Sequence, residues 1–113
     1  MRMLKSVYVT IARFKDVYGN SYFGGWVYIN SLLPDSDKIL IPYQYGYGTA
    51  PEFVAWKLIN EKYQISTDKN FFPLYVSGGE FRELPDGSKV KYSFNDWGYV
   101  RKKDVKRLLT VGF

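Results

Sequence analysis

The sequence predicts one α+β domain spanning residues 1–113: an antiparallel sheet of five to six strands, one main helix and a short basic C-terminal helix. Short segments rich in Val, Ile, Tyr and Phe recur between turn residues in both halves of the chain, which is typical of strands. One segment, about 50–63, has helix-start residues and helical apolar spacing instead. The length, 113 residues, is that of a single domain.

The first half is expected to contain three strands. Val7, Val9 and Ile11 alternate with Tyr8, Thr10 and Ala12, which predicts a strand over about 5–14. Turn residues at 16–20 lead to a second strand over 21–30, and a third follows over about 38–43. Gly24 and Gly25 interrupt the second strand and predict a bulge.

The helix over about 50–63 has the clearest start signal. Thr49 is a favourable N-cap, Pro51 suits the first turn, and Glu52 completes a capping box with Thr49. A helical projection divides the segment into two faces. The apolar face holds Val54, Ala55, Trp56, Leu58, Ile59 and Tyr63, and the polar face holds Lys57, Asn60, Glu61 and Gln64.

The second half is expected to add up to three strands and the basic helix. Strands are predicted over 71–76, 81–84 and 89–94, with turns at 77–79 and 85–88. The final helix is predicted over about 101–109, with Val105, Leu108 and Leu109 on its apolar side.

Composition narrows the chemistry that this chain can perform. It contains no Cys and no His, which excludes thiol catalysis, zinc sites built on these residues and imidazole-based triads. Ser66 and Lys69 match the bare Ser-x-x-Lys pattern, but the supporting motifs are absent. The carboxylate pairs Asp35/Asp37 and Glu80/Glu83 fall in turn-like or edge-strand sequence, where solvated surface is expected. We therefore expect no catalytic residue, no metal and no cofactor.

Most of the excess positive charge lies near the C-terminus. The net charge is +5, and residues 101–107 contribute +4 of it. The basic residues Lys102, Lys103, Lys106 and Arg107 are candidates for contact with phosphates or with an acidic protein, and the alternative is a solvated helix face. The early apolar run is interrupted by Tyr8 and Thr10, and no stretch approaches the ~20 apolar residues of a membrane span. We expect a cytoplasmic protein that does not contact a membrane.

A tyrosine-rich run precedes the main helix. Tyr43, Tyr45 and Tyr47 alternate with Gln44 and Gly46, which places the three rings on one side of an extended segment. The rings are candidates for a stacking platform, and the alternative is a structural connection that covers the end of the sheet. Gly46 and Gly48 would let a backbone or ligand approach the other side. Phe53, on the polar side of the helix, is a further candidate binding residue.

Two segments carry a resemblance to known proteins. Tyr18-Gly19-Asn20-Ser21-Tyr22 and, later, Ile41 to Gly48 (IPYQYGYG) resemble small uncharacterised bacteriophage-encoded proteins over residues 6–60. This implies a phage accessory protein in the host bacterial cytoplasm, and no catalytic residues to transfer. Three strands followed by a helix is also similar to the sheet-based DNA readers of phage-type integrases, although Arg13 is the only arginine on those strands.

These observations predict a non-enzymatic binding protein. The expected partner is a host protein or nucleoprotein complex, and inhibition of a CRISPR-like defence nuclease complex is one specific form of this function. The alternative is a nucleic-acid-binding protein that uses the C-terminal basic helix and the tyrosine-rich segment. The sequence leaves the oligomeric state open.

Overall fold

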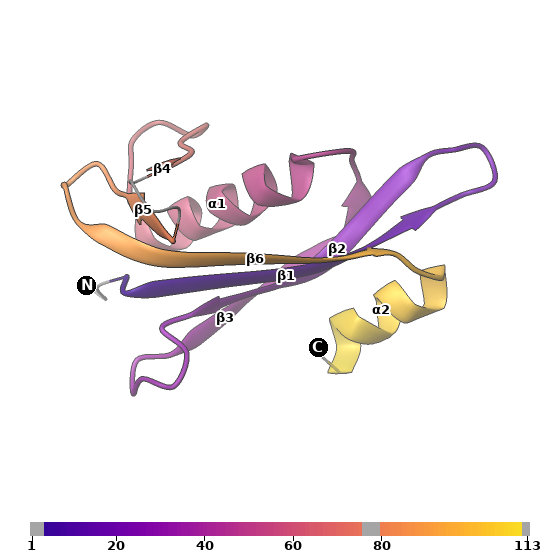
Figure 1. Cartoon of the computed structure of the whole chain (residues 1–113), viewed down its shortest axis with the longest axis horizontal. Helices are drawn as coiled ribbons and strands as arrows, with labels where there is room; N and C mark the ends of the chain where they lie inside the picture. Colours follow the sequence, from indigo (N-terminus) through magenta and orange to yellow (C-terminus); the bar gives the residue numbers. More distant parts are fainter. Residues whose placement is uncertain (1–3, 76–79, 112–113) are drawn as a thin grey trace.

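The computed structural model describes residues 4–75 and 80–111, and it has the predicted α+β fold (Figure 1). The elements in chain order are β1 (Ser6–Lys15), β2 (Ser21–Ile29), β3 (Asp37–Tyr45), α1 (Ala50–Tyr63), β4 (Leu74–Tyr75), β5 (Phe81–Glu83), β6 (Lys89–Tyr99) and α2 (Lys102–Val111).

The strands form one sheet in the order β3-β2-β1-β6-β5-β4. Neighbouring strands are antiparallel except β1 and β6, which pair in parallel at the centre of the sheet. The sheet is thus mostly antiparallel, as predicted, and the β1–β6 pair is the exception. It arises because the chain crosses from β3 over the sheet through α1 before β6 is added beside β1.

The strand boundaries differ most from prediction in the second half. The predicted strand over 71–76 is reduced to β4, and position 76 and the predicted turn at 77–79 lie outside the described residues. In contrast, β6 continues beyond 94 to Tyr99 because its later residues pair with β1 as far as Arg13. Asn, Asp and Gly at 95, 96 and 98 have low strand propensity, so the sequence did not indicate this extension.

The main core lies between α1 and one face of the sheet. The strands supply alternate apolar residues, and α1 supplies Ala55, Trp56 and Ile59, all fully buried. The predicted alternation in β1 is confirmed, since Val7, Val9 and Ile11 belong to this core. The predicted bulge in β2 is wrong in its strand: Phe23 pairs with Gln44 and Gly25 with Ile41, so the extra residue beside Gly24 lies in β3.

The bounds of α1 match the prediction, but two details of the helix do not. The capping box is absent: the Thr49 side chain makes no cap hydrogen bond, and Glu52 instead accepts a 2.6 Å hydrogen bond from the Tyr92 hydroxyl. Burial, reinforced by Glu52, raises the pKa of Tyr92, which keeps this donor protonated. Asn60, expected on the polar face, is buried because its amide bonds the backbone of Ser66 and Asp68 in the following loop.

Helix α2 lies on the opposite face of the sheet from α1, below one half of it in Figure 1. Val105 is its fully buried contact. Gly24 permits the close approach, because a Cβ there would lie 3.0 Å from the Leu109 methyl groups. The Trp26 indole Nε1 donates a 2.9 Å hydrogen bond to the Leu108 carbonyl. The apolar side predicted for this helix is therefore the side that faces the sheet.

We predict that Ile59→Ala lowers the free energy of unfolding by about 2–5 kcal/mol, because it removes a fully buried side chain from the α1–sheet core. Chemical denaturation monitored by circular dichroism measures this loss. Lys57→Ala, at an exposed position of the same helix, is the matched control and should change stability far less. Equal effects of the two substitutions would contradict the assigned helix face.

A second prediction concerns pH, because Asp37 joins β3 to α1. Its carboxylate accepts a 2.7 Å hydrogen bond from the Tyr63 hydroxyl and pairs with Lys62. Hydrogen bonding to Lys62, assisted by Tyr63, lowers the pKa of Asp37 from 3.8 to about 2. The lowered pKa stabilises the fold above the ordinary value, and this stabilisation is lost as pH falls through the folded value. Asp37→Asn should therefore reduce stability at neutral pH, and the difference from wild type should shrink toward pH 2.

Unfolding titrations of wild type and Asp37→Asn across this pH range test the prediction. In Lys62→Gln the pKa of Asp37 should move back toward 3.8, so the loss of stability should begin at higher pH. A difference between wild type and Asp37→Asn that does not vary with pH would contradict the assignment.

Candidate functional site

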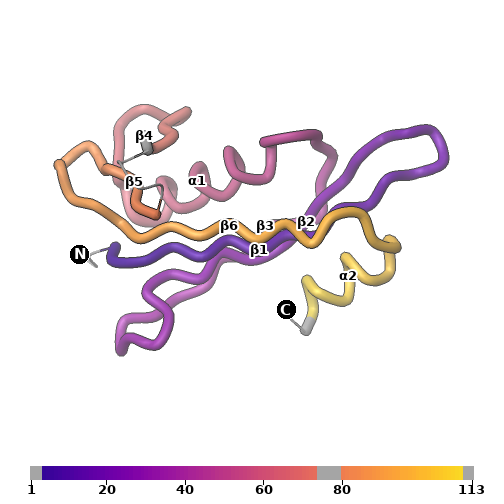
Figure 2. Tube along the Cα trace, in the orientation of Figure 1, coloured from indigo at the N-terminus to yellow at the C-terminus, as the bar shows by residue number. Residues whose placement is uncertain are grey.

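The topology brings the tyrosine-rich run and the basic helix to one end of the sheet. Strands β1 and β3 both run antiparallel to β2, and β6 runs parallel to β1, so β3 and β6 point in the same direction. Figure 2 shows that the chain leaves β3 and enters α2 at the same end of the sheet. Two segments more than 50 residues apart in sequence thereby become neighbours.

Four tyrosine rings form a continuous cluster at this end, which we call the tyrosine cluster (Tyr22, Tyr43, Tyr45 and Tyr47). The Tyr22 and Tyr43 rings stack with centroids 5.4 Å apart and planes 4° apart. Tyr45 contacts Tyr22 and Tyr47 edge-on, at 5.7 and 5.3 Å. Tyr45 is 58% exposed and Tyr47 is 47% exposed, as predicted for a surface feature. The cluster therefore combines two half-buried, stacked rings (Tyr22 and Tyr43) with two accessible rings (Tyr45 and Tyr47).

The basic helix contacts this cluster through two lysines. The Lys102 and Lys106 Nζ atoms lie 5.8 and 5.4 Å from the Tyr43 ring centroid, within cation–π range. Their spacing of four residues places both on the same side of α2. Lys103 and Arg107 are also exposed on α2. The structure thus joins two sequence candidates, the tyrosines and the basic residues, in one surface.

The pKa values of two cluster hydroxyls, those of Tyr43 and Tyr45, are raised. Burial, followed by repulsion from Tyr22 and Asp16, raises the pKa of Tyr43. Hydrogen bonding with Tyr47, followed by partial burial, raises the pKa of Tyr45. Neither ring therefore adds a negative charge that would offset the lysines, and the surface remains cationic.

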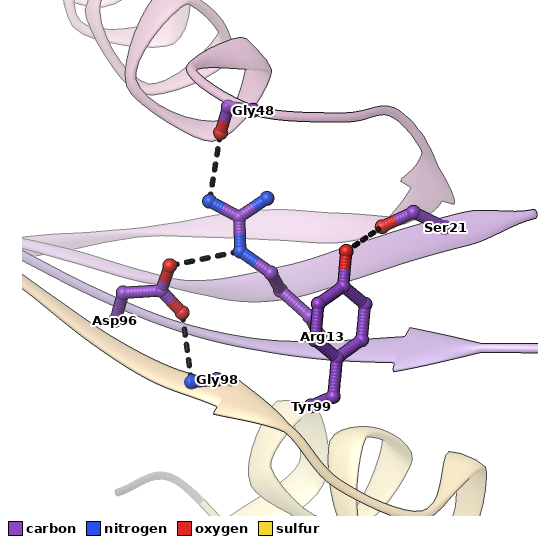
Figure 3. A network of polar contacts seen from close by, with 6 residues as sticks. All are labelled: Arg13, Ser21, Gly48, Asp96, Gly98 and Tyr99. Carbon is purple, nitrogen blue, oxygen red and sulfur yellow. Dashed lines mark hydrogen bonds and ion pairs between the residues drawn. The ribbon is translucent and has the colours of Figure 1, made fainter.

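A polar network holds the two halves of the surface in place (Figure 3). Arg13 of β1 donates from Nε to Asp96 Oδ2 at 2.8 Å and from Nη2 to the Gly48 carbonyl at 2.7 Å, while Asp96 Oδ1 accepts from the Gly98 amide at 2.8 Å. The Ser21 and Tyr99 hydroxyls lie 3.0 Å apart. Gly48 follows Tyr47, and Gly98 and Tyr99 lead into α2, so the network ties both segments to the central strands.

Gly46, within the tyrosine run, serves packing rather than ligand approach. A Cβ at Gly46 would lie 2.5 Å from the Phe23 ring and 3.0 Å from the Ala50 Cβ. Atoms of the protein therefore fill the space where the sequence predicted room for a backbone or ligand. Gly48 has a φ of +55°, which favours glycine. The space beside Gly46 is therefore not a ligand site.

Phe53 does not join the other candidates. It lies on α1, on the opposite face of the sheet from α2, and its ring packs 4.6 Å from Phe72. Phe53 nevertheless remains 52% exposed and, with Lys57 and Lys69, lines a shallow apolar hollow. The Phe53 ring therefore packs against the loop residue Phe72 and is still about half exposed.

The enzyme-like motifs are engaged in local structure. Ser66 Oγ accepts a 3.1 Å hydrogen bond from the Asp68 amide, which is a turn contact. Asp35 accepts from the Asn30 amide at 3.3 Å, and Asp37 is bonded to α1. Within residues 4–75 and 80–111, no group of three or more Asp or Glu side chains is placed to hold a metal ion.

Sequence reasoning missed three residues of this site. Tyr22 was assigned to the second strand without a role, although Tyr22, Trp26 and Tyr28 occupy alternate positions there and an aromatic face was visible in that pattern. The pairing of Arg13 with Asp96 carried no signal, since 83 positions separate them.

Comparison of the chain with protein-family models, curated proteins and solved structures found no match in any of the three. Among the helices of the described residues, none has the length and apolar character needed to cross a membrane.

We predict that Asp96→Asn lowers the free energy of unfolding by about 1–3 kcal/mol, because charged hydrogen bonds to a mostly buried arginine are weakened. The control is Asp104→Asn, which weakens the Arg101–Asp104 pair of the same 2.8 Å length but with an exposed arginine. Solvent screening should make that change nearly neutral. Denaturant titration of both variants measures the contrast, and equal losses would contradict a role for the Arg13 network in fixing the surface.

Proposed function

We propose that this protein binds nucleic acid through the tyrosine cluster and the basic residues of α2. The observation that carries the proposal is the position of Lys102 and Lys106 over the Tyr43 ring, beside the accessible rings of Tyr45 and Tyr47. Lysine side chains contact phosphates, and exposed aromatic rings stack on bases. One surface offers both groups side by side.

The charges of α2 support a polyanionic partner. Four cations, Lys102, Lys103, Lys106 and Arg107, are exposed on a helix of ten residues. The acid in this helix, Asp104, is paired with Arg101. Two of the lysines, Lys102 and Lys103, also lie in the first turn of α2, where the helix dipole disfavours cations, so local stability does not account for them. Contact with phosphates does account for them.

An acidic host protein is the competing partner: the basic residues favour an acidic surface, and the resemblance to phage proteins implies a host. The aromatic rings favour nucleic acid over an acidic protein. Cations at the edge of an interface are enough to steer an acidic protein, so that partner would not require the rings. Phage origin and inhibition of a host defence complex stay predictions from the sequence. A nucleic-acid site is compatible with both, since a nucleoprotein complex also presents phosphates.

The proposal predicts a salt dependence that one pair of variants can test. Fluorescence anisotropy with a labelled oligonucleotide, repeated at several salt concentrations, gives the slope of log affinity against log salt. Lys102→Gln/Lys106→Gln should weaken binding and reduce the magnitude of that slope by about 1.4–1.8, since each phosphate contact contributes roughly 0.7–0.9. Circular dichroism should show an unchanged fold, because both side chains are exposed.

The matched control removes the same charge from the other side of the molecule. Lys57→Gln/Lys69→Gln changes two exposed lysines on the α1 side and should leave the slope near that of wild type. If both variants lower the slope equally, only net charge matters and the site is wrong. If wild type binds no oligonucleotide at physiological salt but captures an acidic protein through Lys102 and Lys106, the competing partner is correct.

A further inference from the structure

The sheet face that carries α2 is only partly covered by it. In Figure 1, α2 lies below one half of the sheet, and no helix of the described residues covers the other half. Alternation places Tyr8 there, because its neighbours Val7 and Val9 point into the α1 core. We call the uncovered part the open face, and its residues are Tyr8, Trp26, Tyr28, Lys38, Leu40, Lys91, Ser93 and Trp97.

Aromatic residues dominate the open face. The row that crosses its centre runs from Lys38 of β3 through Tyr28 and Tyr8 to Ser93 of β6, each directly opposite the next. The Tyr8 and Tyr28 rings lie 6.1 Å apart and are nearly parallel, with planes 29° apart. Tyr8 is 39% exposed and Trp97 is 57% exposed, although the core needs neither ring. Their exposure on a sheet face indicates a binding surface.

The rings are held in defined positions. The Trp97 indole donates a 2.9 Å hydrogen bond to the Thr10 hydroxyl of β1. The Lys38 Nζ lies 5.0 Å from the Trp26 ring, and Trp26 in turn is bonded to α2. These contacts reduce the entropy lost when a ligand stacks on the rings.

The four long strands contribute only positive charge to the open face. The acidic residues of β1, β2, β3 and β6 are Asp37 and Asp96, and both point to the α1 side, where they bond Tyr63 and Arg13. Lys38 and Lys91 point to the open face. At its margin β5 adds the exposed Phe81, opposite Lys91, and Glu83, opposite Lys89. The four strands thus present cations and rings without acids.

We propose that a single-stranded nucleic acid crosses the open face and continues onto the tyrosine cluster and α2. Bases stack on Tyr8, Tyr28 and Trp97, while Lys38, Lys91 and the α2 lysines contact phosphates. This inference rests on the proposed function and specifies its ligand. In a duplex the base faces are covered by neighbouring bases, so exposed rings on a sheet favour an unpaired strand.

A second copy of the chain is the less suitable occupant. In a two-fold dimer the same patch faces itself, so Lys38 and Lys91 of one copy would approach the lysines of the other. Like charges brought together in this way oppose association. A polyanionic strand pairs with these cations instead.

The test compares a labelled single-stranded 20-mer with the same sequence as a duplex. Wild type should bind the single strand more tightly. Tyr8→Thr keeps strand propensity and should lower single-strand affinity by about 5- to 150-fold, the loss expected for one base-stacking ring, while duplex affinity stays unchanged. The matched control is Tyr18→Thr, which alters an 86% exposed tyrosine in the β1–β2 turn and should have no effect.

A second variant does not depend on the stability of Tyr8→Thr. Lys38→Gln/Lys91→Gln, at two exposed positions, should reduce the single-strand salt slope by about 1.4. If this variant and Tyr8→Thr bind as wild type while Lys102→Gln/Lys106→Gln weakens binding, the proposed function stands and this inference fails. If no oligonucleotide binds wild type, both fail. Sedimentation showing a dimer that Tyr8→Thr dissociates, without change in oligonucleotide affinity, would assign the open face to self-association and overturn the inference.

Discussion

The parallel pairing of β1 with β6 is the constraint on which the rest of the structure depends. It makes β3 and β6 run in the same direction, so both strands end at one end of the sheet. The tyrosine cluster lies where β3 ends, and α2 begins just after β6 ends. The 2.8 Å Arg13–Asp96 ion pair, whose arginine is mostly buried, fixes the same end, because Arg13 also holds the loop that carries Tyr47. Without this pairing the lysines of α2 would not reach Tyr43.

The two faces of the sheet carry different kinds of residue. The α1 face contains the main core, and the strand carboxylates Asp37 and Asp96 also point to that side, where they are paired. The α2 face carries lysines and partly exposed rings over its whole length. Because Asp37 and Asp96 are on the α1 side, the central strands leave mainly cations on the other side, which attracts phosphates. The proposed binding of a single strand uses this face from Tyr8 to Lys102.

Part of this architecture was predictable because it is encoded locally. The bounds of α1 follow from apolar periodicity and from Pro51 near its start, and the core positions Trp56 and Ile59 follow from the same periodicity. Predictions from neighbouring residues failed where a side chain bonded a partner outside its own helix. Glu52 bonds Tyr92 instead of completing the capping box, and Asn60 is buried by a loop that its own side chain organises.

The sequence by itself determined the fold class, the main helix and the residue types of the candidate site: tyrosines and lysines, without cysteine or histidine. These properties depend on composition and on spacing within a few residues. Only the tertiary structure decided which of them meet. Lys106 contacts Tyr43 across more than 60 positions, and Phe53 is excluded because it lies on the other side of the sheet. Strand order and direction control such encounters, and they depend on long-range pairing that no local pattern specifies.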